Sequence, residues 1–269
     1  MTGAPGPRPR RRRHHHGSLA LVALALALCL ASCTPSPATT PAAADADPTT
    51  ADARALTTEE AQVLAAMRFR NLDAGARGVA FTLDDRGETS FEGWFDYTTG
   101  VGYGAVSRPE NSLLLWNAEL VATRAAPTER EAAAPLPIPG VDDLERAWAG
   151  GALEPGDSRR DSILAIIGSL GSDRPENPLL LQQSGALWLG QRTLDGVELT
   201  VFSGPVADEA LPAGTTADPE AAATRYWVDA HGLAHRVDVR LGGERAWTTI
   251  RFDDAPGVQL GDPFAQAVR

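Results

Sequence analysis

Apolar side chains recur at every second position along several short segments of this chain, and this alternation most restricts its fold. Such a period is typical of β-strands that bury one face and expose the other. In the first half of the chain it marks four segments, at 79–83, 91–97, 101–106 and 113–122. Gly-containing turn signals separate the first three of them. The sequence therefore predicts four consecutive antiparallel strands in this half.

A second group of strands is expected in the C-terminal half. Segments 187–191 and 197–202 flank Asp195-Gly196, a strong signal for a tight hairpin. Three more expected strands are 224–229, 234–241 and 245–253. In the middle one, Arg236 and Asp238 alternate with valines, so this sheet should have one wet face and one buried face. An antiparallel sheet of about nine strands should curl.

Helices are expected at the start and in the middle of the folded part. Thr57-x-x-Glu60 is a capping-box pattern, and apolar residues at helical spacing predict a helix over 58–71. Ser158-x-x-Asp161 precedes a similar pattern that predicts a helix over 159–170. Shorter helical segments are expected near 141–148 and 179–181. The predicted fold class is α+β, a wide curved antiparallel sheet with helices covering its apolar concave face.

The N-terminus has the organisation of an export signal. Five arginines between Arg8 and Arg13 precede an apolar run at 19–30, and Leu30-Ala31-Ser32-Cys33 follows. The apolar run is shorter than the roughly 20 residues that a transmembrane helix needs, which indicates a cleaved signal. The motif resembles a bacterial lipobox, which implies a diacylglyceryl group on Cys33. The alternative is an ordinary secretory peptide with a chance cysteine.

These features predict three parts of the chain. Residues 1–32 are the expected lipoprotein signal peptide, 33–56 a disordered tether rich in Thr, Pro, Ala and Asp, and 57–269 a single folded domain. The expected location is the extracytoplasmic face of the cell membrane, where the diacylglyceryl group on Cys33 supplies the anchor.

Composition excludes several classes of function. The cysteines are Cys29 and Cys33, so the expected mature domain has no disulfide, thiolate metal site or thiol nucleophile. The chain contains no lysine, which excludes P-loop and Schiff-base chemistry. Once the signal is removed, 19 arginines remain against 35 acidic residues, so no nucleic-acid partner is expected.

Residues of catalytic type form no recognisable constellation. His231 and His235 are four apart but straddle a turn, and although Asp229 and Asp238 could add carboxylates, we interpret both as surface histidines. Ser169 lies beside a glycine but outside any nucleophile motif. The prediction is therefore no catalytic residue, no metal and no cofactor, and a hydrolase with an unrecognised site ranks last among the readings of function.

Tryptophans and glycines interrupt the predicted strands. The six tryptophans either pack the core or line a cavity, and the sequence leaves both open. Gly93, Gly102 and Gly104 lie in the second and third strands, where missing side chains would allow curvature or close approach of a ligand.

The C-terminal hairpin provides a family resemblance. Tyr226-Trp227-Val228-Asp229-Ala230-x-Gly232-Leu233, followed by Arg236, resembles the hairpin of LppX/LprG-type bacterial lipoproteins and related carriers with the LolA-like fold. The resemblance implies a half-barrel closed by helices around an apolar cavity, with helix 159–170 in the lid. It also implies a cavity lined by one residue of that helix and five of the sheet, namely Ile166, Phe81, Phe95, Leu115, Leu199 and Val201. The proline-rich segment 135–139 and the acidic loop 204–223 depart from the family pattern.

The function expected from these observations is a membrane-anchored extracytoplasmic lipoprotein. It would bind or carry an amphiphile, either a lipid, a glycolipid or the acyl chains of a lipoprotein, in an apolar cavity. The alternative is a non-enzymatic envelope sensor or scaffold that binds a partner protein through the same fold.

Overall fold

A single open β-sheet organises the chain in a computed structural model. The structure describes residues 53–83, 89–107, 111–126, 134, 148–206, 211–212 and 217–264, which all lie in one compact unit, Pro41–Arg269. In this part of the chain the sheet has twelve strands, and each strand runs antiparallel to its neighbours. The predicted wide antiparallel sheet is therefore confirmed, with more strands than expected.

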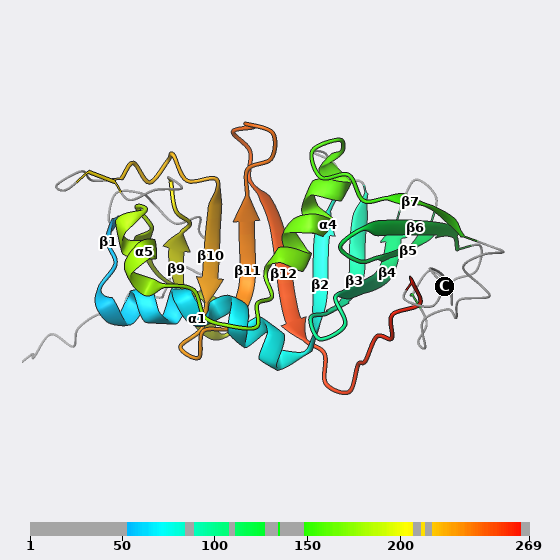
Figure 1. Ribbon diagram of the computed structural model, residues 1–269, viewed down its shortest axis with the longest axis horizontal. Helices are drawn as coiled ribbons and strands as arrows, with labels where there is room; N and C mark the ends of the chain where they lie inside the picture. The colour runs from blue at the N-terminus through cyan, green and yellow to red at the C-terminus, as the bar shows by residue number, and fades with distance from the viewer. Residues whose placement is uncertain are drawn as a thin grey trace, which may run out of the picture. The chain divides into compact units, whose positions relative to one another are not determined.

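The strands form two runs in which neighbours in sequence are neighbours in space. One run is β8 to β12 and the other is β2 to β7, with β1 added beside β8. The last strand pairs with the first long one, so that Ile250 lies opposite Phe81 and the two runs become one sheet (Figure 1). The strands are β1 (Arg54–Ala55), β2 (Ala76–Thr82), β3 (Ser90–Asp96), β4 (Val101–Ser107), β5 (Ser112–Trp116), β6 (Leu120–Ala125), β7 (Ala149–Ala152), β8 (Leu187–Leu194), β9 (Val197–Ser203), β10 (Thr224–Val228), β11 (Ala234–Val239) and β12 (Thr248–Asp254).

Three helices begin at capping residues, of which the sequence marks Thr57 and Ser158 in advance. Thr57 and Glu60 form a complete capping box at the start of α1 (Thr58–Ala74). The Ser158 hydroxyl accepts from Asp161 N at the start of α4 (Arg159–Ser169). Asn177 caps α5 (Pro178–Gln183), whose first residue is a proline. All three helices were expected, and α1 ends at Ala74, three residues beyond its predicted end.

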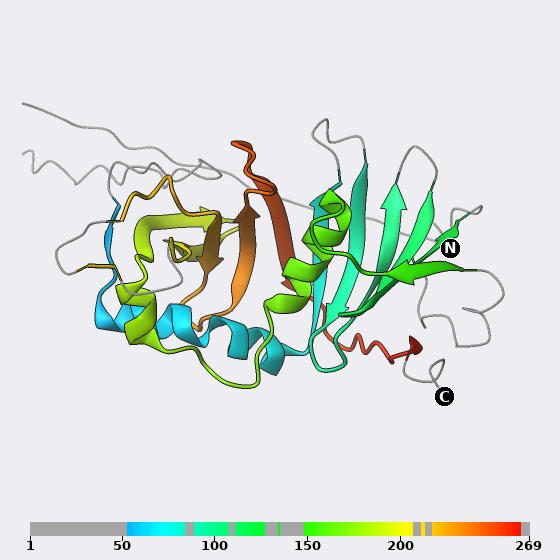
Figure 2. The same cartoon turned by 45° about the horizontal axis from the view of Figure 1, so that its top comes forward.

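The helices share one hydrophobic core with one face of the sheet, which we call the helix face. Buried residues of α1 and α4 join strand residues such as Val79, Phe81 and Phe95 in one cluster. Figures 1 and 2 both show α4 in front of β12 and β2. The core on this face therefore connects both runs of strands.

The other side of the sheet, here the opposite face, carries two further apolar clusters. In β5, Leu114 and Trp116 join the helix-face cluster, whereas Leu113 and Leu115 pack in another with Leu260 and Phe264. In β9, Phe202 lies on the helix face, whereas Leu199 and Val201 pack with Trp227. Successive side chains of a strand point to opposite faces, so one strand contributes to two cores.

The face predicted to be wet is largely buried. Arg236 is 8 % and Asp238 1 % exposed. The Asp238 carboxylate accepts from Trp227 Nε1 at 2.9 Å, Arg236 Nε at 2.8 Å and Thr249 Oγ1 at 2.7 Å. The residues are polar as expected, but burial is tolerated because the charge is paired and hydrogen-bonded.

The structure differs from the predicted bounds in three places. Segment 113–122 is two strands, because the Asn117 side chain accepts from the backbone N–H of Glu119 and Leu120 and forms a turn. β1 lies inside the range 33–56 assigned to the tether, and β7 was not expected. The helix predicted near 141–148 lies outside the described residues except for Trp148, which directly precedes β7.

Candidate functional site

An apolar pocket of about 310 Å³ lies where α4 passes over the helix face, and we call it the α4 pocket. The sheet contributes Phe95 from β3 and Trp116 from β5, and the helix contributes Leu164, Ala165 and Gly168. The remaining lining residues are Gly100, Asn117, Ala118, Leu153 and Ser169. The volume is at the lower end of the range for pockets that bind small molecules.

Aromatic rings form the floor of the α4 pocket. Trp116 and Phe95 lie 5.8 Å apart between ring centroids and are 1 % and 3 % exposed. Phe91 packs edge-on against Trp116 at 5.4 Å and stacks on Phe81 at 4.8 Å. These contacts fix the rings, so the floor is preformed rather than assembled around a ligand.

The strand glycines make room for these rings. A Cβ at Gly102 would overlap the Trp116 indole, and a Cβ at Gly104 or Gly93 would overlap the Phe91 ring. Of the two roles left open for these glycines, curvature or close approach of a ligand, the structure favours the first, because the protein's own side chains and backbone occupy the space that a Cβ would take.

Two of the polar side chains around the α4 pocket, those of Ser169 and Asn117, are bonded within the protein. The Ser169 hydroxyl donates to Ile166 O at 2.7 Å, and the Asn117 side-chain oxygen accepts from Glu119 N in the turn after β5. The lining residues include no ionisable side chain. Trp116 Nε1 is buried and has no hydrogen-bond partner among the described residues. The pocket can therefore hold apolar groups but offers no acid–base or nucleophilic chemistry.

Polar contacts fix α4 over the sheet at both ends. Near its first turn, Arg159 donates to Glu244 at 2.8 Å and to Thr248 of β12 at 2.6 Å. After its last turn, Leu170 O accepts from Asn71 Nδ2 of α1 at 2.9 Å. The helix above the α4 pocket is thus tied to both the sheet and α1.

Asp161 is the charged residue in the first turn of α4. Burial raises the pKa of its carboxyl, but the hydrogen bond from Arg160 at 2.8 Å and that from Glu154 N at 3.3 Å together outweigh burial. The net result is a pKa below the ordinary value of 3.8. A carboxylate near a helix N-terminus is also favoured by the helix dipole.

The six predicted cavity residues are not all brought together. Phe81, Phe95 and Ile166 belong to the helix-face core, and of the six only Phe95 lines the α4 pocket. Leu115, Leu199 and Val201 pack on the opposite face. A shift of one residue in a strand moves a side chain to the other face.

The lining residues that sequence reasoning missed were adjacent to predicted ones. Trp116 follows Leu115 directly, and Leu164 and Ala165 precede Ile166. The signal that could have found Trp116 is Gly102 opposite it in β4, because a glycine facing an aromatic residue across a strand pair leaves space for the ring.

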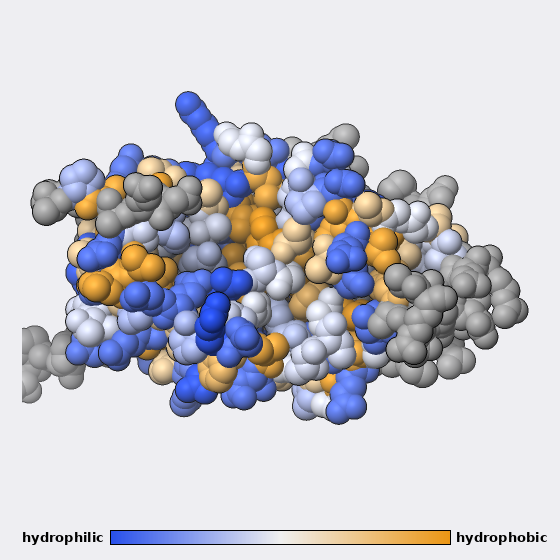
Figure 3. Space-filling view, viewed as in Figure 1, coloured by the Kyte–Doolittle hydropathy of each residue, from blue (hydrophilic) through white to orange (hydrophobic). Residues whose placement is uncertain are grey.

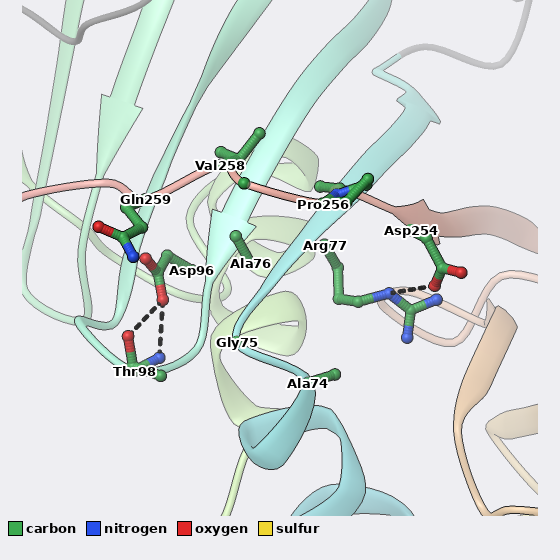
Figure 4. A pocket seen from close by; sticks show the side chains of 12 residues that line it. Ala74, Gly75, Ala76, Arg77, Asp96, Thr98, Asp254, Pro256, Val258 and Gln259 are labelled. Atoms are coloured by element: carbon green, nitrogen blue, oxygen red, sulfur yellow. Dashed lines mark hydrogen bonds and ion pairs between the residues drawn. The ribbon is translucent and has the colours of Figure 1, made fainter.

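A second pocket of about 460 Å³ lies at the turn from α1 to β2 and has a mixed polar and apolar lining (Figure 4). Arg77 Nε donates to Asp253 O at 3.1 Å and lies 3.9 Å from the Asp254 carboxylate. Asp96 accepts from the N–H and hydroxyl of Thr98 and from Leu260 N. Burial lowers the pKa of Arg77, while Asp254 opposes this. Asp96 and Arg77 Nε are bonded within the chain, whereas Arg77 Nη1 and Nη2 are buried without a hydrogen-bond partner among the described residues, and no ligand is assigned to them.

The two histidines of the folded part, His231 and His235, line neither the α4 pocket nor the pocket between α1 and β2. His235 Nε2 is 3.3 Å from Asp229 Oδ2, and Asp229 Oδ1 accepts from the backbone N–H of His231 and Leu233. Burial raises the pKa of Asp229, but the hydrogen bonds from Leu233 N and the His235 ring outweigh burial and leave the pKa below its ordinary value of 3.8. Asp238 is bonded to Trp227 instead. Within the described ranges, no three His, Cys, Asp or Glu side chains are grouped to hold a metal ion.

Cys33 and the signal segment lie outside the described residues, so their assignment stays a prediction. No helix in the described part of the chain has the length and apolarity to cross a membrane. No protein-family model matches the chain, and a search of curated proteins finds no significant match. The resemblance to LppX/LprG-type lipoproteins with a LolA-like fold therefore remains a prediction.

Proposed function

We propose that this protein is a membrane-anchored extracytoplasmic lipoprotein that binds an amphiphile, whose apolar chain enters the α4 pocket. The observation that carries the proposal is a preformed apolar space between sheet and helix, lined without any ionisable side chain. Each methylene group moved from water into such a space gains about 0.8 kcal/mol. Anchoring through Cys33 is the part of the proposal that rests on the sequence alone.

The proposal includes a finer description of the fold, a half-barrel whose concave face is covered by α1 and α4. Two observations support it. The helices share a core with residues from both runs of strands, and the sheet is open, so that its edges β1 and β7 remain unpaired with each other. In this arrangement α4 is the part of the cover that borders the pocket.

Gly168 allows a direct test, because it lies on α4 and faces the pocket floor. A Cβ placed there would be 3.7 Å from Phe95 Cζ, an ordinary contact. Gly168→Leu should fill the pocket, and native mass spectrometry of the purified chain should then show loss of lipid that the wild type retains. Gly168→Ala is the matched control, which keeps the space and removes a helix glycine that costs up to about 1 kcal/mol.

The outcomes separate the proposal from its alternative. Lipid retained by the wild type and by Gly168→Ala but not by Gly168→Leu supports binding in the α4 pocket. Equal retention by both variants would place the ligand elsewhere. A wild-type chain that never takes up lipid, yet crosslinks in cells to one envelope protein, would favour the sensor or scaffold function instead.

A further inference from the structure

Two adjacent leucines of α5 are exposed to solvent. Leu179 and Leu180 are each 56 % exposed, whereas Leu181 is buried and joins the helix-face core. In the described part of the chain, the only other large apolar side chain with high exposure is Val197 at 37 %. Figure 3 shows the resulting apolar patch over α5. We call Leu179 and Leu180 the leucine pair.

The leucine pair lies beside the place where the N-terminal segment joins the sheet. Gln182 Nε2 of α5 donates to Leu56 O at 3.0 Å, and β1 pairs with β8 just after α5 ends. Cys33 and Arg54 are separated by 20 residues. Even fully extended, 20 residues span at most about 70 Å. Because β1 is the first element that the structure describes, an anchor on Cys33 would be connected to the domain at its β1 edge, next to α5.

Charge around the leucine pair does not favour an anionic surface. The helix sequence PLLLQQ has no charged residue. Arg54 of β1 lies 2.7 Å from Glu60, and Arg68 of α1 lies 2.9 Å from Glu176, so both arginines are paired with acids. The chain as a whole has a net charge of −11. Contact with a membrane here would be apolar and insensitive to salt.

We propose that the leucine pair is the surface through which the anchored domain touches the bilayer, inserting between zwitterionic lipid headgroups. This inference rests on the anchoring through Cys33 proposed above. It gives the domain a fixed orientation on the membrane, with α5 and β1 toward the lipid.

The energetics suit an orienting contact rather than an anchor. Burying the exposed part of one leucine side chain changes an equilibrium roughly five- to tenfold. Two leucines are too few to hold a free protein on a vesicle. A tether raises the local concentration into about the millimolar range, where so weak a contact becomes populated. Loss of the leucine pair should therefore change orientation and leave anchoring intact.

The test measures depth with a fluorophore on α5. The chain is purified from membranes and reconstituted in phosphatidylcholine vesicles that contain nitroxide-labelled phosphatidylcholine. One sample carries the label at Gln183→Cys, on the exposed side of α5 next to the leucine pair. The matched control carries it at Asp195→Cys, in the turn at the far end of β8. A second arm replaces residues 1–33 with a hexahistidine tag on nickel-chelating lipid, so that contact is measured whether or not Cys33 is modified.

We expect nitroxide quenching at position 183 to be several times stronger than at 195, and unaffected by salt. Leu179→Gln with Leu180→Gln should lower the inserted fraction at least about tenfold, while the vesicle-bound amount stays the same. Equal quenching at both positions, or quenching that survives the double substitution, would overturn the inference and leave anchoring standing. If the hexahistidine-tagged chain shows the contact at position 183 but the native chain does not float with the vesicles, the anchoring through Cys33 would be overturned while the leucine-pair contact would stand.

Discussion

At the scale of single residues, the clearest constraint is the space that Gly102 leaves for Trp116. A Cβ at position 102 would overlap the indole ring, which is 1 % exposed and packed between Phe91 and Phe95. The ring cannot move without disturbing both neighbours. Gly102→Ala should therefore destabilise the protein by about 2 kcal/mol or more, although alanine is normally better than glycine in a strand. Chemical denaturation measures the difference.

Gly151→Ala is the control for this prediction, because a Cβ at position 151 of β7 meets nothing within 4 Å. Its stability should equal or slightly exceed that of the wild type. If the two alanine variants were equally stable, the indole would not be fixed as described. The sequence indicated that glycines interrupt these strands, but not that an aromatic ring of the protein fills the space, because the pairing of Gly102 with Trp116 depends on strand register.

At the scale of elements, the pH dependence of α4 follows from Asp161. Its folded pKa is lower than its ordinary value, so the ionised form stabilises the folded state. This stabilisation is complete above the ordinary pKa of 3.8 and is lost as the pH falls through the lower folded pKa. Asp161→Asn should cost about 1 kcal/mol at pH 6, and the difference from wild type should shrink below pH 4. Thermal unfolding from pH 6 to pH 3 tests this.

The exposed neighbour Asp157 supplies the comparison for Asp161. It precedes the Ser158 cap and is exposed, so Asp157→Asn should change stability by less than about 0.5 kcal/mol. If the stability difference between Asp161→Asn and the wild type persisted unchanged down to pH 3, Asp161 would act through packing instead of through its charge.

The caps also show how far elements can be predicted from sequence. Thr57 and Ser158 act through local hydrogen bonds to their own helices, so α1 and α4 were predicted close to their bounds. The tight hairpin at Asp195-Gly196 is confirmed, with both residues at positive φ. β1 and β7 gave no such signal, because two short edge strands are stabilised by partners distant in sequence.

At the scale of the whole molecule, the candidate site was predicted only in outline. An apolar space under helix 159–170 was expected, and the α4 pocket lies there. Which side chains line it depends on the face that each strand presents. In β5 the residues Leu113, Leu114, Leu115 and Trp116 are all apolar, so both faces of the strand are apolar. The sequence pattern therefore cannot show which face lines the pocket. Position 115 was therefore assigned to the wrong face.

The pairing of β12 with β2 makes the two runs of strands one structural unit, and this predicts how the molecule unfolds. Ile250 is fully buried in β12 and lies opposite Phe81 of β2. Ile250→Ala should cost about 2–5 kcal/mol by leaving a cavity at this junction. Hydrogen exchange should show equal loss of protection in β4 and β9, one in each run, because both depend on the same junction. Val197→Ala, at the exposed end of a hairpin, should leave both unchanged. Loss confined to one run would mean that the sheet holds two units of independent stability.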